Sequence, residues 1–401
     1  MLKLLRLMGW MLTSLAAAVV LAAGATWWLS RDAQRPGPLA GPTTLVIPSH
    51  TGLVAIAELL ARDGVIRHSL TFAAIAELSG RGHGLQSGEY QFPARASAIE
   101  VLAIIAGGRM VRHKLTIPEG LTSPQVVALV RAARALTGDP GPVPPEGSLF
   151  PDTYIYSYGE SRQALLARMR RAMVHVVGRL WQQRWPGLPL TRPEDAVTLA
   201  SIVEKETAVP AERAHIAGVY INRLRRGMAL DADPTVLYAL EQIAPAPANG
   251  AAAPDHTLTH ADLAIASPYN TYRVKGLPPG PIDNPGRASL RAAMQPEPTD
   301  DLYFVADGKG GHVFSKTLAD QTRNIDTYLK PAAAIGAAVA PAPAADPAAK
   351  ALPPPAAAAA APGHPVGRRA AHHGRRFAVR HAAYRHPCRP SRSRRCRTRA
   401  R

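Results

Sequence analysis

The pattern of apolar residues divides the chain into an N-terminal apolar run and two folded regions. Residues 7–29 are apolar and carry no charge. Residues 43–137 combine short β-type runs such as TTLVIP with amphipathic helical stretches such as GLVAIAELLARDGV. Residues 148–330 mix helical patterns with short strands such as LYFVA and HVF. This pattern predicts an α+β fold carried on an N-terminal transmembrane helix.

The N-terminal apolar run has the length and the flanks of a membrane anchor. At ~1.5 Å rise per residue, residues 7–29 span roughly the ~30 Å hydrocarbon core of a bilayer. Lys3 and Arg6 precede the run, and Trp27 and Trp28 close it at the expected interface. A cleaved signal peptide is the alternative, but the run exceeds the roughly 7–15 apolar residues of such peptides. We expect a single-pass membrane protein with a cytoplasmic end at 1–6 and a body that is exported across the membrane.

Breaks in composition predict the domain boundaries. Residues 30–42 read as a polar linker, and the Pro/Gly cluster GDPGPVPPEG at 138–147 reads as a hinge. Between them lie strand–helix–helix–strand patterns, in which Leu45–Pro48 is echoed by Leu115–Pro118. Such modules recur in carbohydrate-binding domains, although plain packing explains the pattern equally well. Residues 331–401, first Ala/Pro-rich and then Arg/His-rich, predict disorder.

The strong positive charge belongs to the tail and does not indicate a nucleic-acid-binding body. The whole chain carries +18, with 47 Lys+Arg against 29 Asp+Glu. Thirteen arginines and no acids lie between Arg368 and Arg401, which leaves a net charge of +5 for the rest. The two cysteines, Cys388 and Cys396, are also in this tail. We therefore predict no nucleic-acid partner for the folded part, and the role of the tail stays open.

The stretch LASIVEKETAVPAER at 199–213 places one of its glutamates on an apolar helix face. At 100° per residue, Leu199, Ile202, Val203 and Glu206 follow the spacing i, i+3, i+4, i+7 of a single stripe. Glu204 falls on the edge of that face, from which it can reach water. Glu206 is therefore the glutamate that points toward the packing, where a charge is rarely placed without a partner or a purpose.

The surroundings predicted for Glu206 favour its protonated form. Pro210 ends this helix a few residues later, so Glu206 lies in a last turn beside the negative end of the helix dipole. Pro210 also suits the first turn of the next helix, with Glu212 close behind it and Gly227 as the helix stop. Burial and the dipole both raise the pKa of a carboxyl, and a carboxyl protonated near neutral pH can act as a general acid. The structural alternative is a buried carboxylate neutralised by Arg213 or Arg223.

A hydrolytic glycosidase would need a second carboxyl, ~5–5.5 Å away for retention or ~6.5–9.5 Å away for inversion. Glu204 cannot supply it, because side chains at i and i+2 diverge around the helix. Asp231 and Asp233 in LDADPTV are the nearest later candidates. No His/Cys/Asp cluster has metal-ligand spacing, so the residues indicate no metal site.

Several long motifs in fixed order resemble those of the endolytic murein transglycosylases, the YceG-like family. They are EGSLFPDTY, ASIVEKET, VYINRLRRGMALDADPTVLYAL, SPYNTYRVKGLPPGPIDNPG and LYFVADGKGGHVFSKTL. With the anchor and the strand–helix modules, which stand in place of the LysM-like region of the family, the resemblance covers roughly residues 7–330. Gln321 departs from it, since a histidine commonly stands there, and the tail has no counterpart.

The resemblance implies a fold, a substrate and a reaction. Members of the family are anchored in the bacterial inner membrane and cleave nascent peptidoglycan strands internally, at the β-1,4 bond from N-acetylmuramic acid to N-acetylglucosamine. The muramyl 6-hydroxyl attacks its own anomeric carbon and leaves a 1,6-anhydro end, a reaction that requires no metal and no cofactor. An inner-membrane anchor would place the catalytic domain, expected at 148–330, in the periplasm. The catalytic acid is the second glutamate of EKET, here Glu206. Peptidoglycan synthases are expected partners at the level of the family.

Further residues offer groups suited to an N-acetyl sugar or to the support of Glu206. The predicted substrate-binding set is Asn222, Arg223, Asp233, Thr235, Tyr269, Asn270, Thr271 and Tyr272. Within it, Asn222 and Arg223 are expected to orient Glu206 or the muramyl peptide. Two other functions stay open at this point. One is a hydrolytic muramidase that uses Glu206 with Asp231 or Asp233, and the other is a membrane-anchored wall-binding scaffold without activity.

Overall fold

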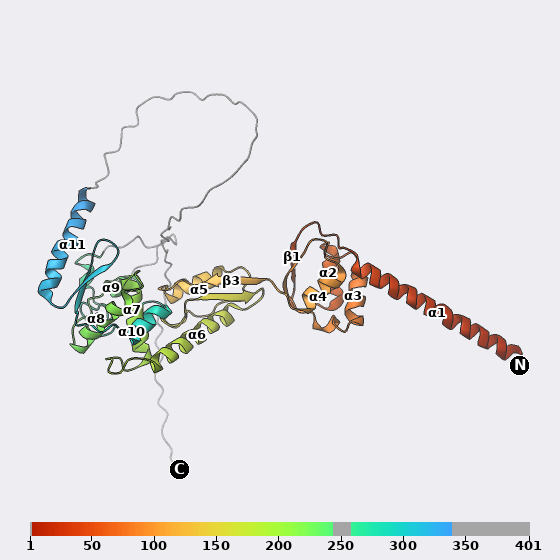
Figure 1. Cartoon of the computed structure of the whole chain (residues 1–401), viewed down its shortest axis with the longest axis horizontal. Coiled ribbons are helices and arrows are strands. Elements are labelled where there is room, and N and C mark those ends of the chain that lie inside the picture. Colours follow the sequence, from red (N-terminus) through yellow and green to blue (C-terminus); the bar gives the residue numbers. More distant parts are fainter. Residues whose placement is uncertain (1, 244–257, 339–401) are drawn as a thin grey trace, which may run out of the picture. The chain divides into compact units, whose positions relative to one another are not determined.

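The computed structural model describes residues 2–243 and 258–338 and shows a mixed α+β protein, which confirms the predicted class (Figure 1). The strands in these ranges form three two-stranded antiparallel sheets, β1–β2, β3–β4 and β5–β6. The chain divides into two compact units. Unit 1 comprises Met1–Glu119 and Val126–Met173, and unit 2 comprises Gly120–Gln125 and Val174–Arg401.

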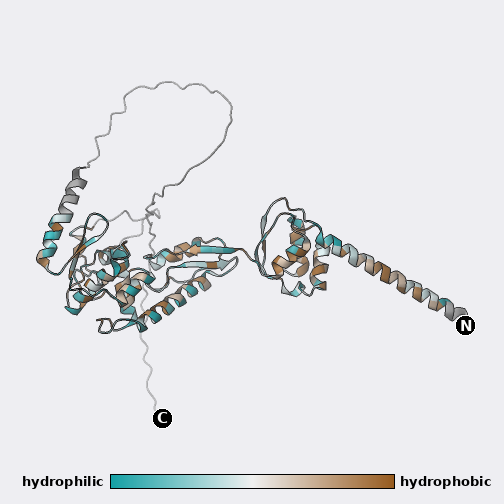
Figure 2. Ribbon diagram, viewed as in Figure 1, coloured by the Kyte–Doolittle hydropathy of each residue, from teal (hydrophilic) through white to brown (hydrophobic). Residues whose placement is uncertain are grey.

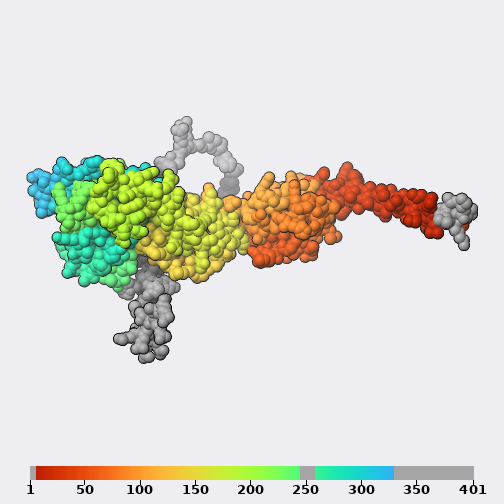
Figure 3. Space-filling model, turned by 90° about the horizontal axis from the view of Figure 1, so that it is seen from below, coloured from red at the N-terminus to blue at the C-terminus, as the bar shows by residue number. Residues whose placement is uncertain are grey.

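Helix α1 (Leu2–Gln34) contains the predicted membrane span. Its part from Arg6 to Gln34 is long and apolar enough to cross a membrane, and its most apolar window is not buried against any described part of the chain. Hydrophobic residues run along α1 in Figure 2, and in Figure 3 the helix extends as an exposed rod from the folded part of unit 1. An anchor at 7–29 is consistent with this helix.

The C-terminal end of α1 is fixed to the folded part of unit 1. Asp32 is buried, accepts a hydrogen bond from Thr71 Oγ1 (2.6 Å) and contacts His68 Nδ1 (2.8 Å). Both partners belong to the start of α3 (Ser69–Leu78) or to its N-cap. The first residues of the predicted linker at 30–42 are therefore helical and held in place.

The predicted strand–helix–helix–strand order is present in unit 1. Strand β1 (Thr43–Ile47) leads into α2 (Leu53–Arg62) and α3, and after the short 3-10 helix η1 (Gly82–Gly84) strand β2 (Gly88–Phe92) pairs with β1. Helix α4 (Ala98–Ala106) follows, with Ser97 and Glu100 forming a capping box. The core of this module consists of fully buried apolar side chains, among them Ile47, Phe72, Tyr90 and Phe92.

A second sheet lies further along unit 1. Strand β3 (Arg112–Thr116) pairs with β4 (Thr153–Ser157), and Leu115 is opposite Tyr154. Helix α5 (Ser123–Ala132) lies between the two strands in sequence, and α6 (Arg162–Gln182) follows them. The strands on either side of the Pro/Gly cluster at 138–147 thus belong to one sheet, and the break between the compact units falls within α6.

Unit 2 is built mainly from helices. Helix α7 packs against α8 and α10, and its residues Leu199, Ala200 and Ile202 are fully buried. A hairpin of two strands follows the helices, as the runs LYFVA and HVF predicted. The bounds are α7 Pro193–Glu206, α8 Arg213–Arg225, α9 Asp233–Ile243, η2 Asp262–Ala264, α10 Arg287–Met294, β5 Tyr303–Ala306 and β6 His312–Ser315.

Both ends of α7 follow from local sequence. Pro193 occupies the first turn, and Asp195 accepts hydrogen bonds from the amides of Thr191 and Arg192. The helix ends at Glu206, because the next residue, Thr207, is extended (φ −138°, ψ 135°). Glu206 is therefore the last helical residue, which confirms its predicted place in the final turn.

The next helix begins later than predicted. Pro210 was expected in its first turn, but α8 begins at Arg213, because the Glu212 amide bonds Val209 O (3.2 Å) and closes a separate turn before the helix. Gly227, at φ 63°, follows the end of α8 and confirms the predicted helix stop.

The C-terminal helix runs past residue 331, where the disordered tail was expected to begin. Helix α11 extends from Leu318 to Ala338. The predicted disorder beyond Ala338, the Arg/His-rich end, Cys388 and Cys396 lie outside the described residues.

Candidate active site

Glu206 is half-buried at the end of α7 and is held by a tyrosine from α8. The Tyr220 hydroxyl donates a hydrogen bond to Glu206 Oε1. The Tyr220 side chain is itself fully buried, and its ring meets Phe304 of β5 edge to face, with centroids 5.8 Å apart. One carboxyl oxygen of Glu206 is thus fixed by a rigid donor, which leaves Oε2 to face a reacting group.

The surroundings of Glu206 raise its pKa, as the sequence predicted. Burial raises the pKa of Glu206 to about 7, and the hydrogen bond from Tyr220 opposes this shift. The negative charge of Asp233 raises the pKa of Glu206 further, whereas the positive charge of Arg223 lowers it. Burial also raises the pKa of Tyr220 well above its usual value, so Tyr220 remains a hydrogen-bond donor at neutral pH. Near pH 7 Glu206 can therefore both give and accept a proton.

Glu204 does not reach water as the helix pattern suggested. Its side chain is only 6% exposed, because Oε1 accepts a hydrogen bond from Arg213 Nη2 (3.1 Å) and Oε2 accepts one from the Gly286 amide (2.9 Å). Gly286 is the N-cap of α10, where the helix dipole favours a carboxylate. Arg213 is thus the partner of Glu204 rather than of Glu206.

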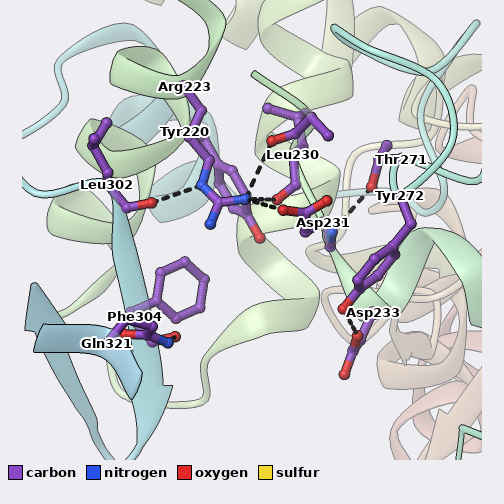
Figure 4. A network of polar contacts seen from close by, with 12 residues as sticks. Tyr220, Arg223, Leu230, Asp231, Asp233, Thr271, Tyr272, Leu302, Phe304 and Gln321 are labelled. Atoms are coloured by element: carbon purple, nitrogen blue, oxygen red, sulfur yellow. Dashed lines mark hydrogen bonds and ion pairs between the residues drawn. The ribbon is translucent and has the colours of Figure 1, made fainter. Parts of the chain in front are cut away.

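Arg223 braces the loop that follows α8. Its Nη1 donates to Leu230 O (2.9 Å) and contacts Asp231 Oδ2 (2.8 Å), and its Nε donates to Leu302 O (2.7 Å) (Figure 4). Its guanidinium carbon lies 5.1 Å from the ring centroid of Tyr303. Arg223 is buried, so these contacts tie the LDADPTV loop to strand β5 from the same helix that carries Tyr220.

The two candidate second carboxyls lie two residues apart, one in this loop and one at the start of α9, and they have different partners. Asp231 is paired with Arg223 and adopts φ 50°, a left-handed conformation that is unusual for a residue other than glycine. Asp233, the first residue of α9, accepts a hydrogen bond from the Tyr272 hydroxyl (2.5 Å) (Figure 4). Asp231 therefore forms a structural ion pair, whereas Asp233 is exposed and close enough to Glu206 to raise its pKa.

Three of the predicted binding residues are buried in hydrogen bonds within the protein. Thr235 Oγ1 lies 2.9 Å from Thr271 Oγ1, and Thr271 Oγ1 accepts from the Ala232 amide (3.0 Å). Asn270 Nδ2 donates to Leu263 O (2.9 Å), and all three side chains are fully buried. They hold the YNTY segment against the LDADPTV loop, and their contact with a substrate stays a prediction.

The remaining predicted residues lie in different surroundings. Tyr269 is half-buried and its ring lies 4.9 Å from that of Tyr238. Asn222 Nδ2 donates to the carbonyls of Thr299 (2.7 Å) and Asp301 (3.1 Å), so in the structure it fixes the 299–301 segment. Its predicted roles, in orienting Glu206 or the muramyl peptide, stay predictions.

Gln321, which stands in place of the family histidine, closes the β5–β6 hairpin onto α11. Its Oε1 accepts from Ser315 Oγ (2.8 Å), and its Nε2 donates to Phe304 O (2.9 Å). Both ends of the amide are therefore satisfied, at the strand that also packs Phe304 against Tyr220 (Figure 4).

Two functional contacts escaped the sequence analysis. Tyr220 was not singled out, although it stands three residues before Arg223 in VYINR and so shares its helix face. Glu212 was predicted to lie in a first helical turn without any further role. In the structure it accepts hydrogen bonds from Thr207 Oγ1 (3.0 Å) and from the His312 amide (2.9 Å). These two bonds fix the end of α7 to strand β6.

No group of three or more His, Cys, Asp or Glu side chains within residues 2–243 and 258–338 is arranged to hold a metal ion. The expectation of chemistry without a metal or a cofactor stays a prediction.

Comparison with known proteins gives a consistent family. The model of the YceG-like family matches residues 45–327. The chain is 30% identical over 319 residues to the endolytic murein transglycosylase of Bacillus subtilis (strain 168), covering 71% of this chain and 84% of that protein. It is also 30% identical to a protein of the same name from Streptococcus pneumoniae (strain ATCC BAA-255 / R6), of which it covers 58%.

A solved structure is also among the similar proteins. A putative yceG-like protein from Listeria monocytogenes is 28% identical, and the match covers 71% of this chain and 98% of that one, with a TM-score of 0.43. The family match spans well over half of the chain and runs through Glu206, Tyr220, Arg223 and the LDADPTV loop. The chain belongs to the YceG-like family.

Proposed function

We propose that this chain is an endolytic murein transglycosylase that cleaves peptidoglycan strands at internal bonds, with Glu206 as its catalytic acid and base. The observation that carries the proposal is a half-buried carboxyl with a pKa of about 7, held by a buried tyrosine. Relatives that are 30% identical to this chain over the aligned residues bear the name of this activity. A single carboxyl of this kind suffices for a reaction whose nucleophile belongs to the substrate.

In the proposed reaction a proton leaves Glu206 and returns to it. Protonated Glu206 donates to the glycosidic oxygen, and the bond from that oxygen to the muramyl anomeric carbon breaks. The 6-hydroxyl of the same muramyl residue forms the new bond to that carbon and gives its proton to the Glu206 carboxylate. The nucleophile is intramolecular, which removes much of the entropic barrier, and the product carries a 1,6-anhydro end.

Tyr220 and Arg223 position the catalytic group in this proposal. The Tyr220 hydroxyl bonds Oε1, so the transferable proton is carried by Oε2. Three residues further along α8, Arg223 holds the loop that bears Asp231 and Asp233. One rigid helix thus sets the carboxyl against the segment that would line the cleft.

The other predicted roles follow from family membership and stay proposals. Tyr269 and Tyr272 would contact the N-acetyl sugars, with Thr235, Asn270 and Thr271 as buried support. The strand–helix module of unit 1 would act as a LysM-like wall-binding region. Helix α1 would span the inner membrane with its N-terminus in the cytoplasm, because Lys3 and Arg6 precede the apolar run. Peptidoglycan synthases would work beside the enzyme.

The decisive experiment is digestion of purified glycan strands by the full chain in detergent, followed by mass spectrometry of the new ends. We expect anhydro ends from the wild type, and at least about a thousandfold slower cleavage by Glu206→Gln. Glu58→Gln, which changes an exposed glutamate of α2, serves as the matched control and should cleave normally.

Two results would overturn the proposal. Reducing ends in place of anhydro ends would mean a hydrolytic muramidase, with Asp233 as the second carboxyl. Undiminished cleavage by Glu206→Gln would remove Glu206 from the chemistry.

A further inference from the structure

Unit 2 contains a cavity of about 570 Å³ whose lining does not include Glu206. Its walls come from the loop after α6, one side of α8, the loop after α10 and the end of β6. This volume falls within the range of small-ligand sites in proteins. The side chains that matter below are Trp185, Asn222, Arg225, Glu297, Asp300 and Lys316.

The cavity lies on the opposite side of α8 from the catalytic carboxyl. At 100° per residue, Gly218, Asn222 and Arg225 share one face of the helix, and Tyr220 and Arg223 share the other. The first three line the cavity, whereas Tyr220 bonds Glu206. The cavity is therefore a second site, separated from the active site by the thickness of one helix.

The walls of this cavity are built and braced. Asn222 fixes the loop after α10 through the carbonyls of Thr299 and Asp301, and Arg225 Nη2 donates to Gly187 O (3.2 Å) in the opposite wall. Gly218 permits the close approach of this loop, since a Cβ there would lie 2.5 Å from Glu297 O. The shape exists before any ligand arrives.

The lining chemistry favours a neutral, polyhydroxylated ligand. Trp185 leaves 42% of its surface exposed and offers an apolar plane. The acidic groups already have cationic or basic neighbours, because Asp300 pairs with Lys316 (3.0 Å) and Glu297 lies 3.4 Å from His215 Nδ1. These paired charges do not select a charged ligand but can still bond hydroxyl and amide groups, and so can Arg225, which donates to the Gly187 carbonyl. An amino sugar presents an apolar ring face together with such groups.

We propose that this cavity is a second glycan-binding site, which takes an N-acetylated sugar of the strand on the face of Trp185. The inference rests on the proposed function and extends it. A glycan strand that binds both in this cavity and in the cleft at Glu206 is held at two points. Cleavage then falls within the strand rather than at a free end. Two linked contacts also raise the affinity for long strands above that for short fragments.

The test measures binding and length preference with the full chain in detergent. In the non-cleaving Glu206→Gln background, adding Trp185→Ala should weaken binding of long, peptide-free glycan strands about tenfold. In the active background, Trp185→Ala should lower the ratio of cleavage rates on long strands and on short fragments by at least about fivefold. Tyr158→Ala, which removes a similarly exposed aromatic (41%) in unit 1, should change neither quantity.

A second variant covers the case in which loss of Trp185 disturbs folding. Arg225→Gln keeps the indole and should weaken the same binding by a smaller factor. The proposal is overturned if both variants bind long strands as tightly as the parent, or if only strands that carry stem peptides depend on Trp185. An inactive Glu206→Gln together with unchanged Trp185→Ala behaviour would reject this site and leave the proposed function intact.

Discussion

Glu204 and Glu206 lie two residues apart in the last turn of α7, and the structure gives them opposite surroundings. Glu204 is almost fully buried between a guanidinium and the N-terminus of α10. Glu206 is half-buried and is bonded to a neutral hydroxyl. The first carboxyl is held by a cation and a backbone amide, whereas the second has a pKa of about 7 and is poised between its two protonation states.

The comparison teaches that burial alone does not identify a catalytic carboxyl. What matters is the partner, because a cation or a helix N-terminus holds a carboxylate ionised, while a neutral donor in a desolvated site leaves it able to exchange a proton. One helix therefore carries a structural and a chemical glutamate in the same turn, and the same Glu→Gln change should have different consequences at the two positions.

The largest effect on stability is expected at Glu204. Glu204→Gln removes the carboxylate that Arg213 contacts and leaves an amide facing the Gly286 donor, so we expect unfolding to become easier by about 2 to 4 kcal/mol. Thermal or denaturant unfolding of the detergent-solubilised chain measures the change. The cleavage rate per folded molecule should stay within about threefold of the wild type.

The result that would break the comparison is a Glu204→Gln protein that is as stable as the wild type but unable to cleave. Glu204 would then take part in the chemistry, and its ion pair with Arg213 would be a feature of the catalytic site rather than of the scaffold.

The next largest effect is a pH-dependent gain in stability for Glu206→Gln. The pKa of Glu206 is raised in the folded state from its usual 4.5 to about 7, so the stability that the protonated form contributes is fully present below pH 4.5 and is lost as the pH rises through 7. Glutamine does not ionise and keeps this contribution. At pH 8 the variant should be more stable than the wild type, on the order of 2 kcal/mol, and at pH 4.5 the two should be equal.

Unfolding curves of the two proteins at both pH values measure this difference. A stability gap that is the same at pH 4.5 and pH 8 would show that Glu206 does not titrate with a raised pKa, and that the two glutamates differ less than the comparison holds.

The local features of this site could be predicted from the sequence. Apolar periodicity placed Glu206 on the packed face of α7, and Pro210 placed it near the helix end, because both features depend on residues within two turns. The strands and helices of the first module and the two strands β5 and β6 were predicted for the same reason. The motif order led to the family that the comparisons show.

The nonlocal part could not be predicted. The burial of Glu204 depends on Gly286, which lies 82 residues away in the chain, and no helical pattern reports on it. Tyr220 reaches Glu206 across a turn whose geometry is set by Glu212 and by a strand 100 residues further on. Thr235 and Thr271 suit a sugar site by residue type, but the loops that bring them together also bury them.

The smallest and most specific effect is expected from Tyr220→Phe, which keeps the ring against Phe304 and removes only the hydroxyl. The hydrogen bond lowers the pKa of Glu206, so its loss should raise that pKa, and the fall of activity on the alkaline side should move up by about one pH unit. Cleavage at pH 5 should drop about tenfold, because Oε1 is no longer held and the proton is not confined to Oε2. A pH–rate profile on glycan strands measures both changes. If the rate drops while the alkaline limb stays in place, Tyr220 acts only through packing, and its hydroxyl does not set the pKa of Glu206.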